Sequence, residues 1–239
     1  MLTLAIAIGL GSLLGYLLYS LVGSILLSVF IFIAALLGIN FLVGKYFMKK
    51  MTALMESVEK DLRSEKMDRA VEKLKSGYSY GKWQFFVKKQ IDSQIGSIYY
   101  IRKKFDEALP YLENSFNRNW GAMAMLASHH FRTKNYEKTY KVMDETVAAN
   151  KKEPFVYSLY AWFLSEQKDD DKAIAILTKG LKKLPLNERL QSEADSLKNR
   201  KKIKMQNYGA MWMQLHLGKS ADGARPYQMH LANQRIKRR

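Results

Sequence analysis

The sequence predicts an all-α protein in two parts, and two observations lead to this prediction. Residues 1 to 44 carry no charged side chain, so all 39 Lys and Arg and all 22 Asp and Glu lie in the remainder of the chain. From residue 51 onward, apolar residues recur at spacings of three and four, which is typical of amphipathic helices. The chain therefore joins an apolar, membrane-like part to a charged, helical part.

The apolar part predicts a transmembrane helical hairpin. A membrane-spanning helix needs about 20 apolar residues, and residues 1–44 are long enough for two. Residues 22–24 (Val-Gly-Ser) suit a tight reversal between spans at 2–21 and 25–44. A single crossing with a buried or interfacial first segment is one alternative. A cleaved signal peptide is another, but it calls for a basic n-region, which this sequence lacks.

Basic residues set the expected orientation. Lys45, Lys49 and Lys50 follow the second span directly, and basic residues that flank a span tend to stay in the cytoplasm. The chain contains no Cys, which agrees with a reducing compartment. We expect a bacterial inner-membrane protein whose charged part is cytoplasmic, with an organellar membrane as the alternative.

Two glycines in the first span predict close helix packing. Gly11 and Gly15 form a GxxxG pattern, and small residues at this spacing let helix backbones approach each other in lipid. The first interpretation is that the two spans pack against each other. The alternatives are a homo-oligomer, or a hairpin that contacts a larger membrane complex.

The charged part contains an internal repeat. Residues 105–112, 136–143 and 170–177 align on the small residues Ala108, Thr139 and Ala173, which lie 31 and 34 positions apart. These units resemble the tetratricopeptide repeat (TPR), a 34-residue helix–turn–helix unit. In that family, a small residue in the first helix packs against one in the second. The pairs here are Gly96 with Ala108, Ala127 with Thr139, and Ala161 with Ala173.

The resemblance implies a TPR-like α-solenoid and divides the charged part. We expect a juxtamembrane helix and a degenerate TPR-like helix pair at 45–82, three repeats at 83–185, a capping helix at 186–204 and a basic tail at 205–239. The capping helix has an apolar stripe of Leu186, Leu190, Ala194 and Leu197, with Glu193 elsewhere on its surface. A repeat array needs such a terminal helix to close its exposed core.

The resemblance also implies a binding groove on the concave face, which the first helix of each repeat lines. The corresponding positions are small, polar or aromatic and carry no charge: Gln90, Ser93, Ser97, Tyr100, Ala124, Ser128, Phe131, Phe155, Ser158, Trp162 and Ser165. Such a groove suits an extended or helical peptide segment of a protein partner. It lacks the Lys and Asn clamp with which chaperone-binding members of the family hold a terminal carboxylate.

The C-terminal tail is strongly basic. Residues 198–239 contain eleven Lys or Arg and one acidic residue, Asp222. Within it, Tyr208, Met211, Trp212 and Leu215 recur at helical spacing, which predicts a short amphipathic helix. This helix is expected either on the membrane surface or folded back onto the repeats.

Three alternatives remain for what the tail contacts: anionic lipid, nucleic acid or ribosomes, or solvent without a dedicated partner. The residues expected to contact a membrane or another polyanion are Lys198, Arg200, Lys201, Lys202, Lys204, Trp212, Arg235, Lys237, Arg238 and Arg239.

Nothing in the sequence predicts catalysis. It has no phosphate-binding glycine loop, no nucleophile motif and no metal-ligand spacing, so we expect neither an enzyme nor a cofactor. The preferred hypothesis is a membrane-anchored TPR adaptor or scaffold that recruits a protein through the groove. The alternatives are a membrane tether for nucleic acid or ribosomes, and a structural subunit of a larger membrane complex.

Overall fold

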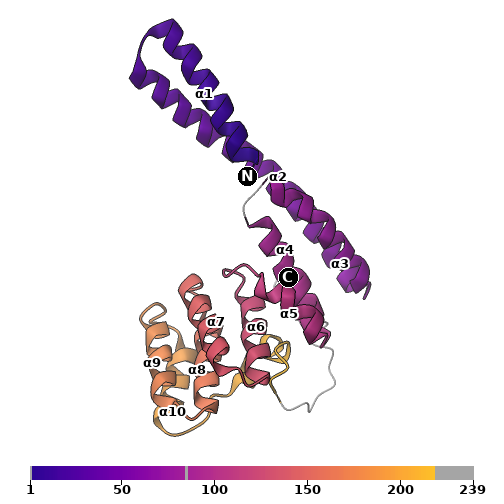
Figure 1. Cartoon of the computed structure of the whole chain (residues 1–239). Helices are drawn as coiled ribbons and strands as arrows, with labels where there is room; N and C mark the ends of the chain where they lie inside the picture. Colours follow the sequence, from indigo (N-terminus) through magenta and orange to yellow (C-terminus); the bar gives the residue numbers. More distant parts are fainter. Residues whose placement is uncertain (1, 84–85, 219–239) are drawn as a thin grey trace, which may run out of the picture. The chain divides into compact units, whose positions relative to one another are not determined.

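The computed structural model describes residues 2–83 and 86–218, and its secondary structure in these ranges is entirely helical (Figure 1). This confirms the all-α fold class. The chain divides into two compact units, Met1–Ile91 and Asp92–Arg239.

The first unit opens with a hairpin of two apolar helices, α1 (Leu2–Val22) and α2 (Ile25–Arg63), which pack against each other (Figure 1). Gly23 reverses the chain with φ = +69°, a conformation that glycine adopts without steric cost. Ser24 then caps α2, because its hydroxyl accepts a hydrogen bond from Leu27 N at 3.4 Å. Both helices are long and apolar enough to cross a membrane, which indicates membrane association.

Gly11 and Gly15 face α2. A Cβ atom built at Gly11 would lie 3.1 Å from Phe32 Cδ2, and one at Gly15 would lie 3.3 Å from the Ser28 carbonyl oxygen. Because the gap at each glycine is this narrow, a larger side chain would push α1 away from α2. The glycines therefore serve the packing of the hairpin on itself, the first of the interpretations of the GxxxG pattern.

The second helix extends much further than the expected span at 25–44. α2 has 39 residues, which corresponds to about 58 Å at 1.5 Å per residue. The first charge, Lys45, marks a change in polarity, but the residues that follow it are good helix formers and continue the helix. The juxtamembrane helix expected after residue 44 is therefore the continuation of the second apolar helix.

α3 (Met67–Ser76) packs back on the charged end of α2. An ion pair joins them: Lys73 Nζ lies 2.5 Å from the carboxylate of Asp61 in α2. The hydrogen bond from Lys73 is the main cause that lowers the pKa of Asp61. A 3₁₀-helix, η1 (Gly77–Lys82), follows α3.

α4 (Val87–Ile101) carries the chain into the second unit. The helices that follow it are α5 (Phe105–Glu113), α6 (Trp120–Arg132), α7 (Tyr136–Ala149), α8 (Pro154–Glu166), α9 (Asp170–Leu181), α10 (Glu188–Lys198), η2 (Met205–Tyr208) and α11 (Ala210–Met213). Helices that follow each other pack together from α5 to α10, and α8 also contacts α6 and α10.

The turns that join three pairs of helices in this unit share one geometry. Lys103, Lys134 and Lys168 each adopt a positive φ, of 63°, 59° and 64°. In each turn the next amide, that of Lys104, Asn135 or Asp169, donates to the carbonyl five residues earlier, at 3.0, 2.8 and 3.1 Å. This is the 6→1 hydrogen bond of a Schellman helix end. The helix pairs α4–α5, α6–α7 and α8–α9 are therefore joined by equivalent turns.

The small residues of the sequence alignment lie where the helices of a pair approach each other. Ala108, Ala127, Thr139, Ala161 and Ala173 are fully buried. At Gly96 the two helices approach closely, since an added Cβ atom would lie 2.8 Å from Leu112 Cδ2 and 3.1 Å from the Leu112 backbone nitrogen.

α10 differs from the expected capping helix in two ways. Leu186 precedes the helix and is 94% exposed, so it is not part of the apolar stripe, whereas Leu190, Ala194 and Leu197 are buried. Glu193 is also buried, although the sequence pattern placed it away from the stripe. The reason is that α10 does not end the packed structure, because residues beyond it cover this side.

Candidate peptide-binding site

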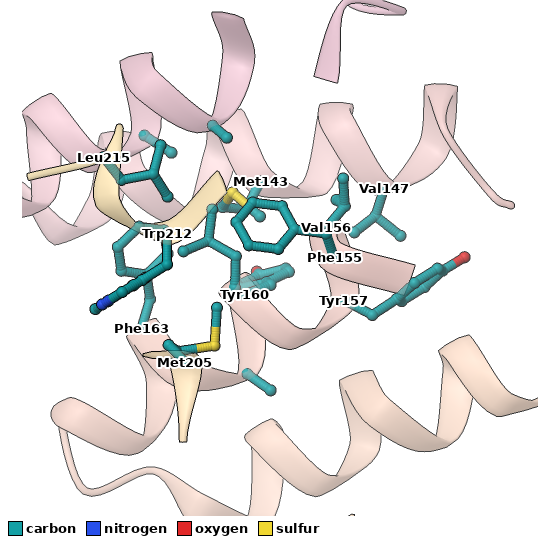
Figure 2. Close-up of a cluster of buried hydrophobic side chains, with 14 of the residues drawn as sticks. Met143, Val147, Phe155, Val156, Tyr157, Tyr160, Phe163, Met205, Trp212 and Leu215 are labelled. Atoms are coloured by element: carbon teal, nitrogen blue, oxygen red, sulfur yellow. The ribbon is translucent and has the colours of Figure 1, made fainter. Parts of the chain in front are cut away.

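The chain's own C-terminal segment, residues 203–217, lies on the face expected to form the partner groove. Tyr208 packs edge-on to Phe155 with ring centroids 4.9 Å apart, and Trp212 packs on Trp162 at 4.8 Å. Figure 2 shows Trp212 and Leu215 in one cluster with the aromatic side chains of α8. Of the two positions expected for the amphipathic segment, the structure therefore has the one folded back onto the helical pairs.

This segment is an integral part of the core. Tyr208, Trp212 and Leu215 are 7%, 5% and 2% exposed, and Ile203 and Met205 are buried with them. Burying one large apolar side chain contributes about 1.5–3 kcal/mol, so these five side chains hold the segment in place firmly. The contacts follow α8 from Phe155 near its start to Trp162 near its end.

A buried polar cluster fixes the first half of the segment. Ser158 in α8 donates a hydrogen bond to the carboxylate of Glu193 in α10, and its hydroxyl lies 2.7 Å from the Tyr208 hydroxyl. The Arg189 guanidinium stands over the Tyr208 ring, 4.4 Å from its centroid. Three elements, α8, α10 and η2, therefore meet through these four side chains.

Burial changes the titration of this cluster. It raises the pKa of the Glu193 carboxyl, although hydrogen bonds with Ser158 and Tyr208 and the charge of Arg189 act in the opposite direction. Burial, together with the negative charge of Glu193, also raises the pKa of the Tyr208 hydroxyl. A charged carboxylate at this position therefore has a free-energy cost, which is relevant to the pH dependence of the fold.

The second half of the segment is held by α4 and α5. The Tyr100 hydroxyl donates a hydrogen bond to the Leu215 carbonyl at 3.0 Å, and burial raises the pKa of Tyr100 to about 12. A ring nitrogen of His216 lies 3.2 Å from the Ile101 carbonyl oxygen, and its ring packs against Tyr100 and Phe105. Burial lowers the pKa of His216.

Six of the eleven residues expected in the groove are gathered around this segment: Tyr100, Ser128, Phe131, Phe155, Ser158 and Trp162. Phe131 reaches it indirectly, because its ring packs on Trp162 and Phe163. A side-chain hydrogen bond with Ser128 lowers the pKa of Tyr100 and so opposes the larger effect of burial.

The other five expected groove residues play different parts. Ser93 accepts a hydrogen bond from the Phe116 amide at 2.9 Å, and Ser97 donates to the Ser93 carbonyl within α4. Ala124 is buried in the core and Ser165 is partly buried. Gln90 is exposed and belongs to the first unit.

The residues expected to contact a membrane or polyanion separate into three groups. Lys198, Arg200, Lys201, Lys202 and Lys204 are exposed. Trp212 is buried against Trp162, so in this conformation it cannot contact a membrane, contrary to the expectation from its helical spacing. Arg235, Lys237, Arg238 and Arg239 lie outside the described residues.

The sequence pattern does not indicate Glu193, Arg189 or His216 as members of this site. Their contacts with Tyr208 and Ile101 join positions up to 115 residues apart, and no repeat pattern encodes them. The one available signal was the spacing of Tyr208, Trp212 and Leu215, which marked an apolar stripe without indicating what it packs against.

Within residues 2–83 and 86–218, no group of three or more His, Cys, Asp or Glu side chains is placed to hold a metal ion. No protein family, curated protein or solved structure matches this chain. The site is therefore characterised by its own geometry: an aromatic and hydroxyl-bearing face that packs against the chain's own residues 203–217.

Proposed function

We propose that this protein is a membrane-anchored helical-repeat adaptor whose groove binds a peptide segment of a protein partner. One observation carries the proposal: the face made by α4 and α8 already holds a polypeptide segment, residues 203–217, through ring contacts and hydroxyl hydrogen bonds. The hairpin of α1 and α2 would hold the chain in a bacterial inner membrane, with the repeats in the cytoplasm.

Two features support the TPR-like character of the repeats. The equivalent turns at Lys103, Lys134 and Lys168 lie 31 and 34 residues apart, the same intervals that separate the buried small residues Ala108, Thr139 and Ala173. A superhelix of such pairs offers an extended concave surface for binding, which is the role we propose for the groove.

A partner would have to replace the resident segment. The groove offers two aromatic contacts, with Phe155 and Trp162, and a hydroxyl group at Ser158 that can hydrogen-bond to a hydroxyl of the partner. We therefore propose a partner segment that presents two aromatic side chains four residues apart, as Tyr208 and Trp212 are. In this proposal the resident segment sets the affinity that a partner must exceed.

Cleaving the connection to the segment tests this proposal. The turn at 199–202 is exposed, so a protease recognition sequence inserted there should be tolerated. After the intact chain has folded in detergent and been cut, the fragment that begins at Ile203 is held by groove contacts alone. We expect it to stay bound and to exchange with a labelled synthetic peptide of residues 203–217.

Trp162→Ala should accelerate release of the cut fragment by about 10- to 100-fold, equivalent to about 1.4–2.8 kcal/mol. The matched control is Tyr111→Ala, which truncates a ring that packs on Tyr99 between α4 and α5. Equal release rates for these two variants would contradict the proposal. Failure of the labelled peptide to replace the cut fragment in the native chain would contradict it as well.

The second candidate function is contact with anionic lipid or nucleic acid through the exposed cations Lys198, Arg200, Lys201, Lys202 and Lys204. Each basic residue near an anionic membrane surface contributes about 1 kcal/mol before screening. The nucleic-acid version has less support, because Tyr208 and Trp212, the rings proposed to stack on bases, are buried. Binding of the full chain to anionic vesicles and to RNA, compared over a salt series, distinguishes the two.

A further inference from the structure

An aromatic cluster lies at the open end of the hairpin. It consists of Tyr46 and Phe47 in α2, Tyr80 in η1, and Trp83 directly after η1, and we call it the aromatic collar. The Trp83 ring stacks on Phe47 with centroids 5.6 Å apart and an interplanar angle of 27°. The Tyr80 ring meets Phe47 edge-on at 5.9 Å.

A hydrogen bond attaches the collar to the first apolar helix as well. The hydroxyl of Thr3, in the first turn of α1, donates to the Trp83 carbonyl at 2.7 Å. Trp83 therefore contacts the start of α1 and the point on α2 just after Lys45. These are the two places where the apolar helices end on this side of the hairpin.

The position of the collar matches the edge of a hydrocarbon layer. From Ile25 to Gly44 the uncharged part of α2 has 20 residues, or about 30 Å at 1.5 Å per residue, which is the thickness of a bilayer core. The collar begins two residues later. At that depth Trp and Tyr are enriched in membrane proteins, because their rings are apolar and their polar groups reach water.

The charges around the collar are complementary to an anionic surface. Lys45, Lys49 and Lys50 are exposed on the same stretch of α2. The Lys50 ammonium lies 5.0 Å from the centroid of the Tyr46 ring, and a hydrogen bond with Tyr46 raises the pKa of Lys50. These cations are therefore placed beside the aromatic rings at the same level of the helix.

We propose that the aromatic collar lies in the headgroup layer of an anionic membrane and makes residues 77–83 a third membrane-contacting element beside the two apolar helices. The proposal rests on the membrane insertion of the hairpin. It goes further because it assigns a lipid contact to a segment far from the apolar run, which follows from the Thr3 and Phe47 contacts of Trp83.

Spin labels on single cysteines test this directly, since the chain has no native Cys. Three full-length variants are reconstituted in vesicles of phosphatidylcholine and phosphatidylglycerol: Ser79→Cys in η1, Leu37→Cys in the apolar part of α2, and Ser64→Cys at the end of α2. All three positions are exposed, so labelling leaves the collar rings intact. Accessibility to oxygen and to a water-soluble nickel complex then reports the depth of each label.

The label at Ser79 should report headgroup depth, with nickel accessibility several-fold below that of Ser64 and above that of Leu37. Trp83→Ala in the Ser79→Cys chain should raise its nickel accessibility to the level of Ser64. If Ser79 equals Ser64 while Leu37 is protected from nickel, the collar proposal is overturned and the anchor proposal stands. If Leu37 is itself accessible to nickel, the anchor proposal fails and the collar proposal fails with it.

Discussion

Glu193 is a carboxylate in a place that favours its neutral form. Burial raises its pKa, so the folded state binds a proton more readily than the unfolded chain does. The free energy of unfolding is therefore highest below the ordinary glutamate pKa of about 4.3 and falls as the pH rises through the raised folded-state value. The groups that face Glu193 are Ser158, Tyr208 and Arg189.

Glu193→Gln should remove this pH dependence, because the amide keeps an acceptor for Ser158 and carries no charge. We expect a higher melting temperature than the native chain at pH 7 and no difference near pH 3, where Glu193 is protonated in both the folded and the unfolded state. Melting followed by circular dichroism in detergent, over a pH series, measures this. Glu188→Gln, at an exposed position of the same helix, is the control and should leave the native pH profile unchanged.

Lys134 adopts a left-handed conformation at the turn between α6 and α7, with φ = +59°. A non-glycine residue in this conformation costs about 1–2 kcal/mol. Glycine avoids this cost, but its greater conformational freedom in the unfolded chain offsets part of the gain. Lys134→Gly should therefore raise the free energy of unfolding by about 0.5–1 kcal/mol. Chemical denaturation measures the change.

The control for Lys134→Gly is Lys141→Gly, at an exposed position inside α7. There glycine should lower the free energy of unfolding by about 1 kcal/mol, because it weakens a helix interior. Equal effects at the two positions would show that the turn geometry is not as described.

Helices α4 and α5 meet where Gly96 faces Leu112. An added methyl group would lie 3.1 Å from a backbone nitrogen, which cannot move without shifting α5. Gly96→Ala should therefore lower the free energy of unfolding by about 1–3 kcal/mol, despite the better helix propensity of alanine. Thermal melts of the full chain measure the change.

Gly121 in α6 provides the matched control, because an added Cβ atom there would meet one atom within 4 Å, Asn119 Oδ1 at 3.6 Å. Gly121→Ala should be neutral or stabilising by up to about 1 kcal/mol. A destabilisation at Gly121 equal to that at Gly96 would contradict the packing of α4 on α5.

The sequence predicted the elements where local chemistry decides them. Gly23 predicted the reversal between the apolar helices, and the recurring small residues predicted which helices form pairs. The length of α2 was not predictable from the apolar run, because a change in polarity at Lys45 marks a change of environment and not a helix end. Leu186 was wrongly assigned to the apolar stripe because it lies four residues before Leu190, a helical spacing, although α10 begins only at Glu188.

The candidate site was predictable in part. Phe155, Ser158 and Trp162 could be assigned to one face because they share a helix and a register. Occupation of that face by Tyr208 and Trp212 could not be assigned, because it depends on contacts between residues 50 apart in the chain. An amphipathic pattern shows that one side of a segment is buried, but it does not show which other part of the protein covers that side.

At the scale of the whole molecule, the chain joins an apolar hairpin to a helical array in which its own C-terminal segment occupies the candidate groove. We propose that, at the membrane, this groove exchanges the resident segment for a segment of another polypeptide. Ser165, one turn beyond Trp162 in α8 and partly buried, is a suitable position from which to detect such an exchange.

The most direct measurement places a photoreactive amino acid at Ser165 of the full chain and irradiates native membranes that contain it. We expect an adduct with a second polypeptide, weakened by Trp162→Ala and retained with Tyr111→Ala, in protein that remains in the membrane fraction. Adducts confined to the chain itself in every variant, with no second polypeptide attached, would contradict it.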